Sequence, residues 1–209
     1  MLYRRTLGLP RTMPTLSHAK SFGQVGSIFV LLVAIPDIGW VLGIVGLILM
    51  LLAIKEISEV VGDRAIYSNM LWAVGLAIAA IVIAVLVIVG SVLRFIGLGN
   101  LSMMRSDFNA ATVPSGDVVG LIASVLVGLL LVWIVMLVSA VFVRRSYTSI
   151  AARLKIGTFE TAGLIYLIGA ATTIILVGFA LLLVAQILVV VAFFSMEDKP
   201  ATQAASAPA

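Results

Sequence analysis

Four long apolar blocks dominate the sequence, at residues 22–54, 70–93, 118–143 and 161–194, with Asp37 as their only charged residue. The hydrocarbon core of a bilayer is about 30 Å thick and is crossed by about 20 helical residues, so apolar runs of this length indicate membrane spans. The second and third blocks have the length of single, somewhat tilted helices. The pattern predicts an all-α fold, a polytopic transmembrane helical bundle.

The first block is too long for one ordinary span, because 33 helical residues would extend roughly 50 Å. Pro36-Asp37 interrupts it near the middle. If the chain turns back there and the N-terminus is cytoplasmic, ten basic residues lie on the cytoplasmic side and two outside, whereas a single crossing divides them six and six. Cytoplasmic loops carry an excess of Lys and Arg. We therefore predict a helical hairpin and a cytoplasmic N-terminus.

The last block is also over-long, but no Pro, Asn or Asp marks a turn in it. Its opening, Phe159-x-x-x-Gly163-x-Ile165-Tyr166, echoes the opening of the first block, Phe22-x-x-x-Gly26-x-Ile28-Phe29. Repeats are common in membrane folds, and this one favours a second hairpin and about six spans in total. Five spans is the alternative, and the side of the C-terminus is left open.

The segments outside the spans complete the predicted organisation. Residues 1–20 form a basic cytoplasmic tail, residues 21–196 the transmembrane domain, and residues 197–209, which are small, polar and Pro-containing, a disordered tail. The spacing of apolar residues in Arg144–Lys155 fits a short basic helix lying on the lipid surface. We expect a multi-pass protein of the cell (plasma) membrane.

The composition excludes several classes of chemistry. The chain is 63% hydrophobic and 11% charged, whereas ordinary soluble domains carry about 25% charged residues. It has no cysteine, and its one histidine, His18, lies in the N-terminal tail, so thiolate and histidine-cluster metal sites are excluded. The net charge of +4 fits topology signalling and not nucleic-acid binding. No nucleophile–base pair or phosphate loop is recognisable, so we expect no enzymatic activity and no cofactor.

Asp37, with Pro36 before it, is the sharpest candidate for a functional residue. A carboxylate inside the bilayer costs about 2.5–3.5 kcal/mol on insertion scales, so an intramembrane acid suggests function. A Pro-broken helix that carries an acid is also how many transporters build a site. The other interpretation is an exposed hairpin turn, for which both residue types are suited. The count of basic residues favours the turn.

Small residues recur at helical spacing on two of the blocks. They are Gly39, Gly43 and Gly46 in the first block, and Gly120, Ser124 and Gly128 in the third. Faces of small residues let helix backbones approach closely in lipid, and polar side chains such as Gln186 add hydrogen bonds between helices. These faces predict helix packing, either inside the bundle or against a partner.

Four motifs stand out: GWVLGIVGLIL at 39–49, KEIS at 55–58, Phe159-x-x-x-Gly163, and AFFS at 192–195. Through them the chain resembles, over roughly residues 20–196, an uncharacterised, largely archaeal family known as domain of unknown function 996. The resemblance implies a small multi-span integral membrane protein. It supplies no activity, ligand or catalytic residue.

These observations lead to an expectation about function that rests mainly on what the spans contain. We expect an integral membrane protein with a non-enzymatic structural or accessory role, in contact with the lipid bilayer and with either a second copy of itself or another membrane protein. The alternative is a small transporter or channel with a broken-helix site near Asp37.

Overall fold

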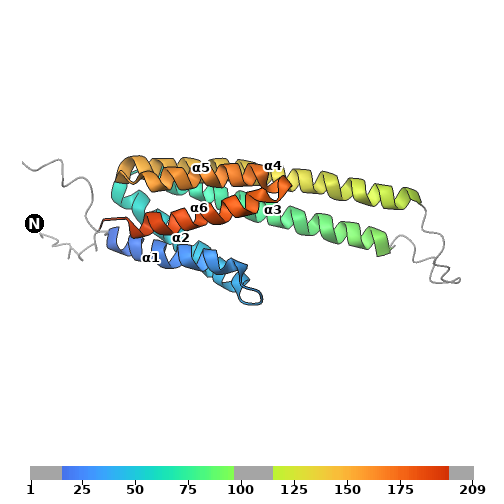
Figure 1. The fold of residues 1–209 in the computed structure, drawn as a ribbon, viewed down its shortest axis with the longest axis horizontal. Helices are drawn as coiled ribbons and strands as arrows, with labels where there is room; N and C mark the ends of the chain where they lie inside the picture. The colour runs from blue at the N-terminus through green and yellow to red at the C-terminus, as the bar shows by residue number, and fades with distance from the viewer. Residues whose placement is uncertain (1–15, 97–114, 198–209) are drawn as a thin grey trace, which may run out of the picture.

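The computed structural model describes residues 16–96 and 115–197, and within them every regular element is a helix (Figure 1). The six α-helices are α1 (Leu16–Leu31), α2 (Gly39–Val61), α3 (Arg64–Ile96), α4 (Ser115–Leu154), α5 (Gly157–Thr172) and α6 (Val177–Phe194). Two short 3-10 turns follow α1 and α5: η1 (Leu32–Ala34) and η3 (Thr173–Ile175). The predicted all-α fold is confirmed.

Both over-long blocks are hairpins. The first is α1–η1–α2 and the last is α5–η3–α6, so the described chain has the six helices that the repeat favoured. Five of them, α2 to α6, are long and apolar enough to cross a membrane. The first, α1, has only 16 residues and begins at Leu16, inside the segment predicted as a tail. Of the two predicted tails, residues 1–15 and 198–209 lie outside the described residues. The chain is thus a multi-pass membrane protein.

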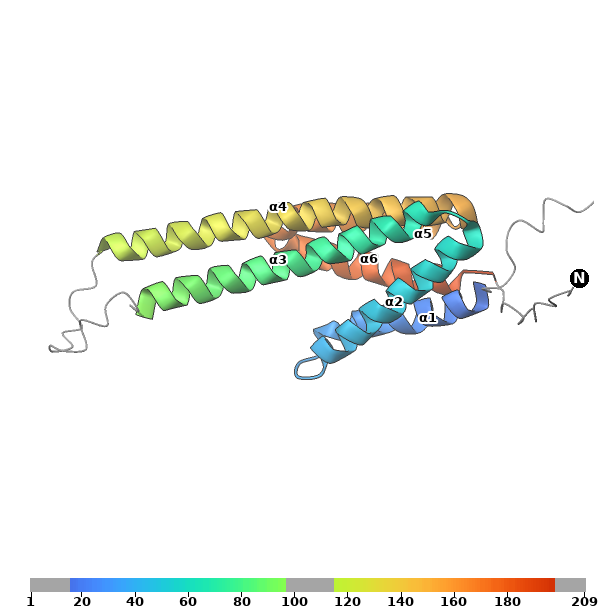
Figure 2. The same ribbon diagram turned by 180° about the vertical axis from the view of Figure 1, so that it is seen from behind.

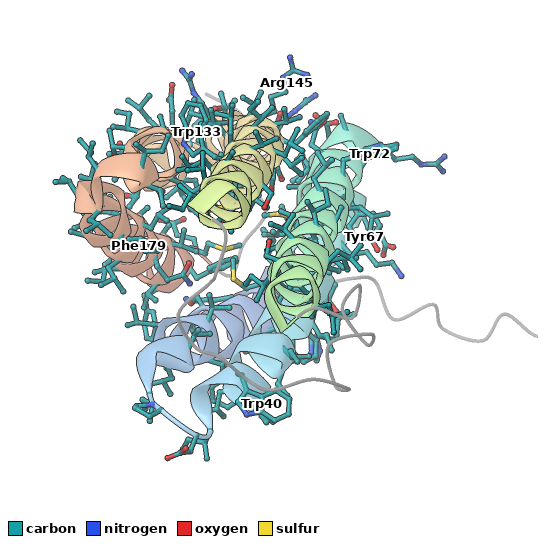
Figure 3. All side chains as sticks on the ribbon, turned by 90° about the vertical axis from the view of Figure 1, so that its right-hand side faces the viewer. Trp40, Tyr67, Trp72, Trp133, Arg145 and Phe179 are labelled. Carbon is teal, nitrogen blue, oxygen red and sulfur yellow. The ribbon has the colours of Figure 1, made fainter. Side chains whose placement is uncertain are left out.

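The helices form a closed ring in chain order. Each helix packs against the next, and α6 packs against α1. Consecutive helices form three hairpins, α1–α2, α3–α4 and α5–α6, and α3–α4 extends well beyond the other two (Figures 1 and 2). Seen from the end where α3 and α4 project, the three hairpins surround a common centre (Figure 3).

The opposite end of the ring carries most of the charge, and we call it the basic end. It contains the α2–α3 and α4–α5 turns, the start of α1 and the end of α6 (Figure 1). An ion pair joins Arg153 Nη2 of α4 to Asp63 Oδ2 of the α2–α3 turn at 3.3 Å. A second pair, Lys55 Nζ to Glu59 Oε1 at 4.0 Å, lies along the last turns of α2. Both pairs are solvent-accessible, so each contributes little to stability.

An aromatic stack closes the interior near the basic end. The rings of Tyr147 and Phe159 have centroids 5.8 Å apart, and Phe159 meets Phe193 edge-to-face at 5.1 Å. This stack ties α4, α5 and α6 together. Fully buried isoleucines from α2, α3 and α4 complete this part of the core: Ile54, Ile57, Ile66 and Ile150.

The prediction of a lipid-surface helix at residues 144–155 is wrong. The segment consists mostly of the last turns of α4, and its apolar residues Tyr147, Ile150 and Ala151 are buried in the core. Arg145 points away from the bundle (Figure 3). An apolar stripe beside a basic face has the same helical spacing whether it meets lipid or another helix. The neighbouring helices α3 and α5 occupy the face that was assigned to lipid.

Candidate functional site

The centre of the ring contains a cavity of about 140 Å³. All six helices contribute to its lining, so distant parts of the sequence meet there around a common space. Six of the lining residues bear on its chemistry: Met50 of α2, Met70 of α3, Ser139 and Tyr147 of α4, Tyr166 of α5 and Gln186 of α6. We take this central cavity as the candidate site.

The walls of the central cavity are apolar, with a few neutral polar groups. None of the described side chains that line it is charged. The Ser139 hydroxyl donates to the backbone carbonyl of Ala73 at 2.8 Å, which joins α4 to α3. The Gln186 side-chain amide donates to the carbonyl of Ser27 at 3.0 Å, which joins α6 to α1. These two groups both line the cavity and hold the ring closed.

The hydroxyls of Tyr147 and Tyr166 differ from the polar groups of Ser139 and Gln186. Neither tyrosine hydroxyl forms a hydrogen bond within residues 16–96 and 115–197. In the same residues, the one fully enclosed side-chain oxygen or nitrogen without a partner is Glu56 Oε2. The hydroxyls of Tyr147 and Tyr166 are therefore not fully enclosed, and both side chains line the central cavity. Such groups in an apolar site need a hydrogen-bonding partner.

The chemistry available in the central cavity is neutral hydrogen bonding. Each tyrosine hydroxyl can donate and accept, and the Gln186 side-chain oxygen can accept. Among the described residues, no group of three acidic or histidine side chains is placed to hold a metal ion. The arrangement suits an uncharged ligand better than an ion.

A pair of serines locks α3 to α4 on the same face as the central cavity. Ser139 and Ser146 are two helical turns apart, and their hydroxyls donate to carbonyls of Ala73 and Ile66, which are also two turns apart. On the other side of α4, the Trp133 indole donates to the carbonyl of Ala170 in α5 at 3.2 Å (Figure 3). Polar side chains inside the bundle thus bond across helix pairs.

The structure places Pro36 and Asp37 in the exposed turn between η1 and α2, away from the central cavity. Asp37 has a φ of 68°, a left-handed conformation that Asp tolerates better than most residues. The turn closes through a hydrogen bond from Gly39 N to Ile35 O at 2.9 Å. The transporter alternative stays a prediction, and Asp37 would serve it from an exposed position.

The glycines predicted for packing lie at contacts inside hairpins. Gly46 faces Gly26 and Val30 of α1, while Gly39 and Gly43 face Val33 of η1. In α4, Gly128 is buried against Val87 of α3. The other two, Gly120 and Ser124, are half-buried on the same helix.

Of the polar residues that line the central cavity, sequence reasoning singled out only Gln186, as a hydrogen-bonding group between helices, and the structure confirms that bond. Tyr147 was assigned to a lipid-facing stripe and Tyr166 was noted only as part of the repeat. The seven-residue spacing of Ser139 and Ser146 was a readable signal, since it puts two hydroxyls on one face of a helix. No pattern within a single block shows that six helices converge on one point.

Comparisons with known proteins show the family to which the chain belongs. Residues 42–187 match the family described as "Protein of unknown function (DUF996)". The chain belongs to this family. It is also 32% identical to the "Uncharacterized protein MJ1644" of the archaeon Methanocaldococcus jannaschii over 183 residues, which cover 88% of this chain and 94% of that protein. The predicted family resemblance is confirmed. No solved structure matches the chain.

Proposed function

We propose that this member of the family is a non-enzymatic accessory component of the cell membrane, with its N-terminus in the cytoplasm. In this role it packs against a second copy of itself or against another membrane protein. The observation that carries the proposal is the α3–α4 hairpin, whose outer half the other four helices leave uncovered (Figures 1 and 2).

The length of that hairpin supports a packing role. With 33 and 40 residues, α3 and α4 are about 50 Å and 60 Å long. The hydrocarbon core is only about 30 Å thick. The outer half exposes large apolar side chains such as Leu86, Ile88 and Leu126. Because it is a lone pair of helices, a partner helix would cover apolar surface that the bundle leaves open.

The exposed face of the outer half also allows close approach. Around Gly90 of α3, no other part of the described chain would come within 4 Å of an added Cβ atom. Val87, one turn earlier, instead packs on Gly128 of α4. Close approach at small residues is a main source of helix association in lipid.

The absence of cysteine makes a site-specific test direct. A benzophenone maleimide attached to Gly90→Cys is photolysed in native membranes, with Val191→Cys on the exposed face of α6 as the matched control position. We expect a protein–protein adduct of defined mass from position 90 and none from position 191. Lipid adducts alone at both positions, with a monomer in native mass spectrometry, would refute the accessory role.

A further inference from the structure

We infer that the central cavity is a binding site for an uncharged, ring-sized molecule that carries a hydroxyl or carbonyl oxygen and reaches the site from the hydrocarbon interior of the membrane. This inference goes beyond the proposed accessory role and does not depend on it. It rests on the size and lining of the central cavity, on its closure at the basic end, and on the depth of the α5–α6 turn.

Size and lining define the ligand class. An apolar protein cavity of about 150 Å³ is known to stay dry and to bind benzene. The central cavity, at about 140 Å³, has the same scale, but it adds the hydroxyls of Tyr147 and Tyr166 to apolar walls. An uncharged ring with one oxygen satisfies both features, whereas an ion would find no opposite charge among the lining side chains.

Access from the basic end is closed. The stacked rings of Tyr147, Phe159 and Phe193 lie there, and Phe159 and Phe193 are fully buried. Gly23 of α1 fits against this stack so tightly that an added Cβ atom would overlap the Phe193 ring. We infer that a ligand enters from the other end, where the α1–α2 and α5–α6 hairpins stop short of α3–α4 (Figure 1).

The register between α5 and α4 places the α5–α6 turn inside the hydrocarbon. A Cβ atom on Gly163 would lie 3.2 Å from the Cα atom of Arg144, so the two residues share one level. With the charged Arg144 taken as the edge of the hydrocarbon, Leu176, 13 residues beyond Gly163, lies about 20 Å into a core of about 30 Å. Beside it, α4 continues without charge as far as Val118. Figure 1 shows this turn near the middle of α4.

The side chains of the turn fit that depth. Ile174 is 62% exposed, Ile175 63% and Leu176 74%, a composition that water would disfavour and lipid chains would accept. The hydroxyls of Thr172 and Thr173 donate to the carbonyls of Ile168 and Gly169, both at 2.8 Å. Backbone polar groups in hydrocarbon must find partners within the protein. The mouth of the ring next to this turn is therefore bathed by hydrocarbon.

Photolabelling in lipid nanodiscs tests the site with two matched probes, 4-azidophenol and azidobenzene, which differ only in the hydroxyl. Peptide mapping locates the adducts, and excess phenol competes for saturable sites. We expect saturable labelling of the segments that line the central cavity, around Met50 and Met70. Labelling confined to lipid-facing segments, or labelling that phenol does not compete, would overturn the inference.

Three variants make the outcome specific. Ala77→Leu fills the lining and should remove the saturable labelling, whereas Ala79→Leu, on the exposed face of the same helix, should leave it unchanged. Tyr166→Phe should lower 4-azidophenol labelling about five-fold, the change in binding expected from the loss of one hydrogen bond. It should leave azidobenzene labelling unchanged. If Ala77→Leu does not fold, Tyr166→Phe decides alone. Equal effects of Tyr166→Phe on both probes, or unchanged labelling in folded Ala77→Leu, would contradict the inference.

Discussion

The contact between α1 and α2 offers the sharpest quantitative prediction, through the substitution Gly46→Ala. A Cβ atom on Gly46 would lie 2.7 Å from Gly26 O and 2.7 Å from Val30 N. Both neighbours are backbone atoms, so no side chain can rotate away. Ordinary contact begins at 3.4 Å, and the two helices would have to separate by 0.7 Å. A gap of about 0.5–1 Å forfeits a quarter to a half of the dispersion energy of the atoms that line it.

Two opposing effects set the expected change in the free energy of unfolding. Overpacking of this kind costs about 1–3 kcal/mol. Replacing Gly by Ala in a helix returns up to about 1 kcal/mol. We therefore expect Gly46→Ala to lower the free energy of unfolding by about 1 kcal/mol.

Gly75→Ala on α3 is the matched control, because an added Cβ atom there meets nothing within 4 Å. It keeps the helix-propensity gain without the clash, so its stability should equal or exceed that of the unsubstituted protein. Equilibrium unfolding by SDS in mixed micelles, followed by circular dichroism, measures both variants. If Gly46→Ala is as stable as Gly75→Ala, the close backbone approach of α1 and α2 is refuted.

Three further substitutions, one of them with a matched control, test the core and the polar contacts by the same unfolding assay. Phe193→Ala should lower the free energy of unfolding by about 3–5 kcal/mol because the ring is fully buried in the aromatic stack. The neighbouring Phe194 is 54% exposed, so Phe194→Ala should change it by no more than about 0.5 kcal/mol. Equal losses would contradict the assignment of the two faces. Ser139→Ala should cost about 0.6 kcal/mol, the average for a hydrogen bond between membrane helices, and an unchanged stability would show that its bond to Ala73 contributes nothing. Arg153→Ala should lower the free energy of unfolding by less than about 1 kcal/mol because the ion pair between Arg153 and Asp63 is solvent-accessible. A larger loss would indicate that Arg153 makes stabilising contacts beyond that pair.

The first hairpin could be predicted from local features of the sequence, whereas the count of six helices rested on the echo between the first and last blocks. Block length fixes whether a helix can cross the bilayer, and Pro36-Asp37 together with the basic residues fixes where the first block turns. The second turn has no such signal. It occurs where Gly178 of α6 packs directly on the Gly169 carbonyl of α5 and where Leu176 adopts a left-handed φ of 61°, which is uncommon for this residue type.

The central cavity could not be predicted because it depends on which helices become neighbours. Tyr147, Tyr166 and Gln186 lie on α4, α5 and α6. The packing of α5 against both neighbours brings them to one space, which α1, α2 and α3 complete. The same limit explains the error at residues 144–155. Apolar spacing there identified the buried face of a helix, but nothing in that segment distinguishes a protein neighbour from lipid.

The most direct test of this architecture uses two single-cysteine variants, Ile38→Cys in the polar first turn and Leu176→Cys in the apolar second turn. Each is treated in intact cells with a membrane-impermeant thiol reagent and again after solubilisation. We predict that Ile38→Cys reacts in intact cells, which places the first turn at the outer surface and the basic end in the cytoplasm. Leu176→Cys should react only after the membrane is dissolved. Rapid labelling of Leu176→Cys in intact cells, or no labelling of Ile38→Cys there, would contradict the account.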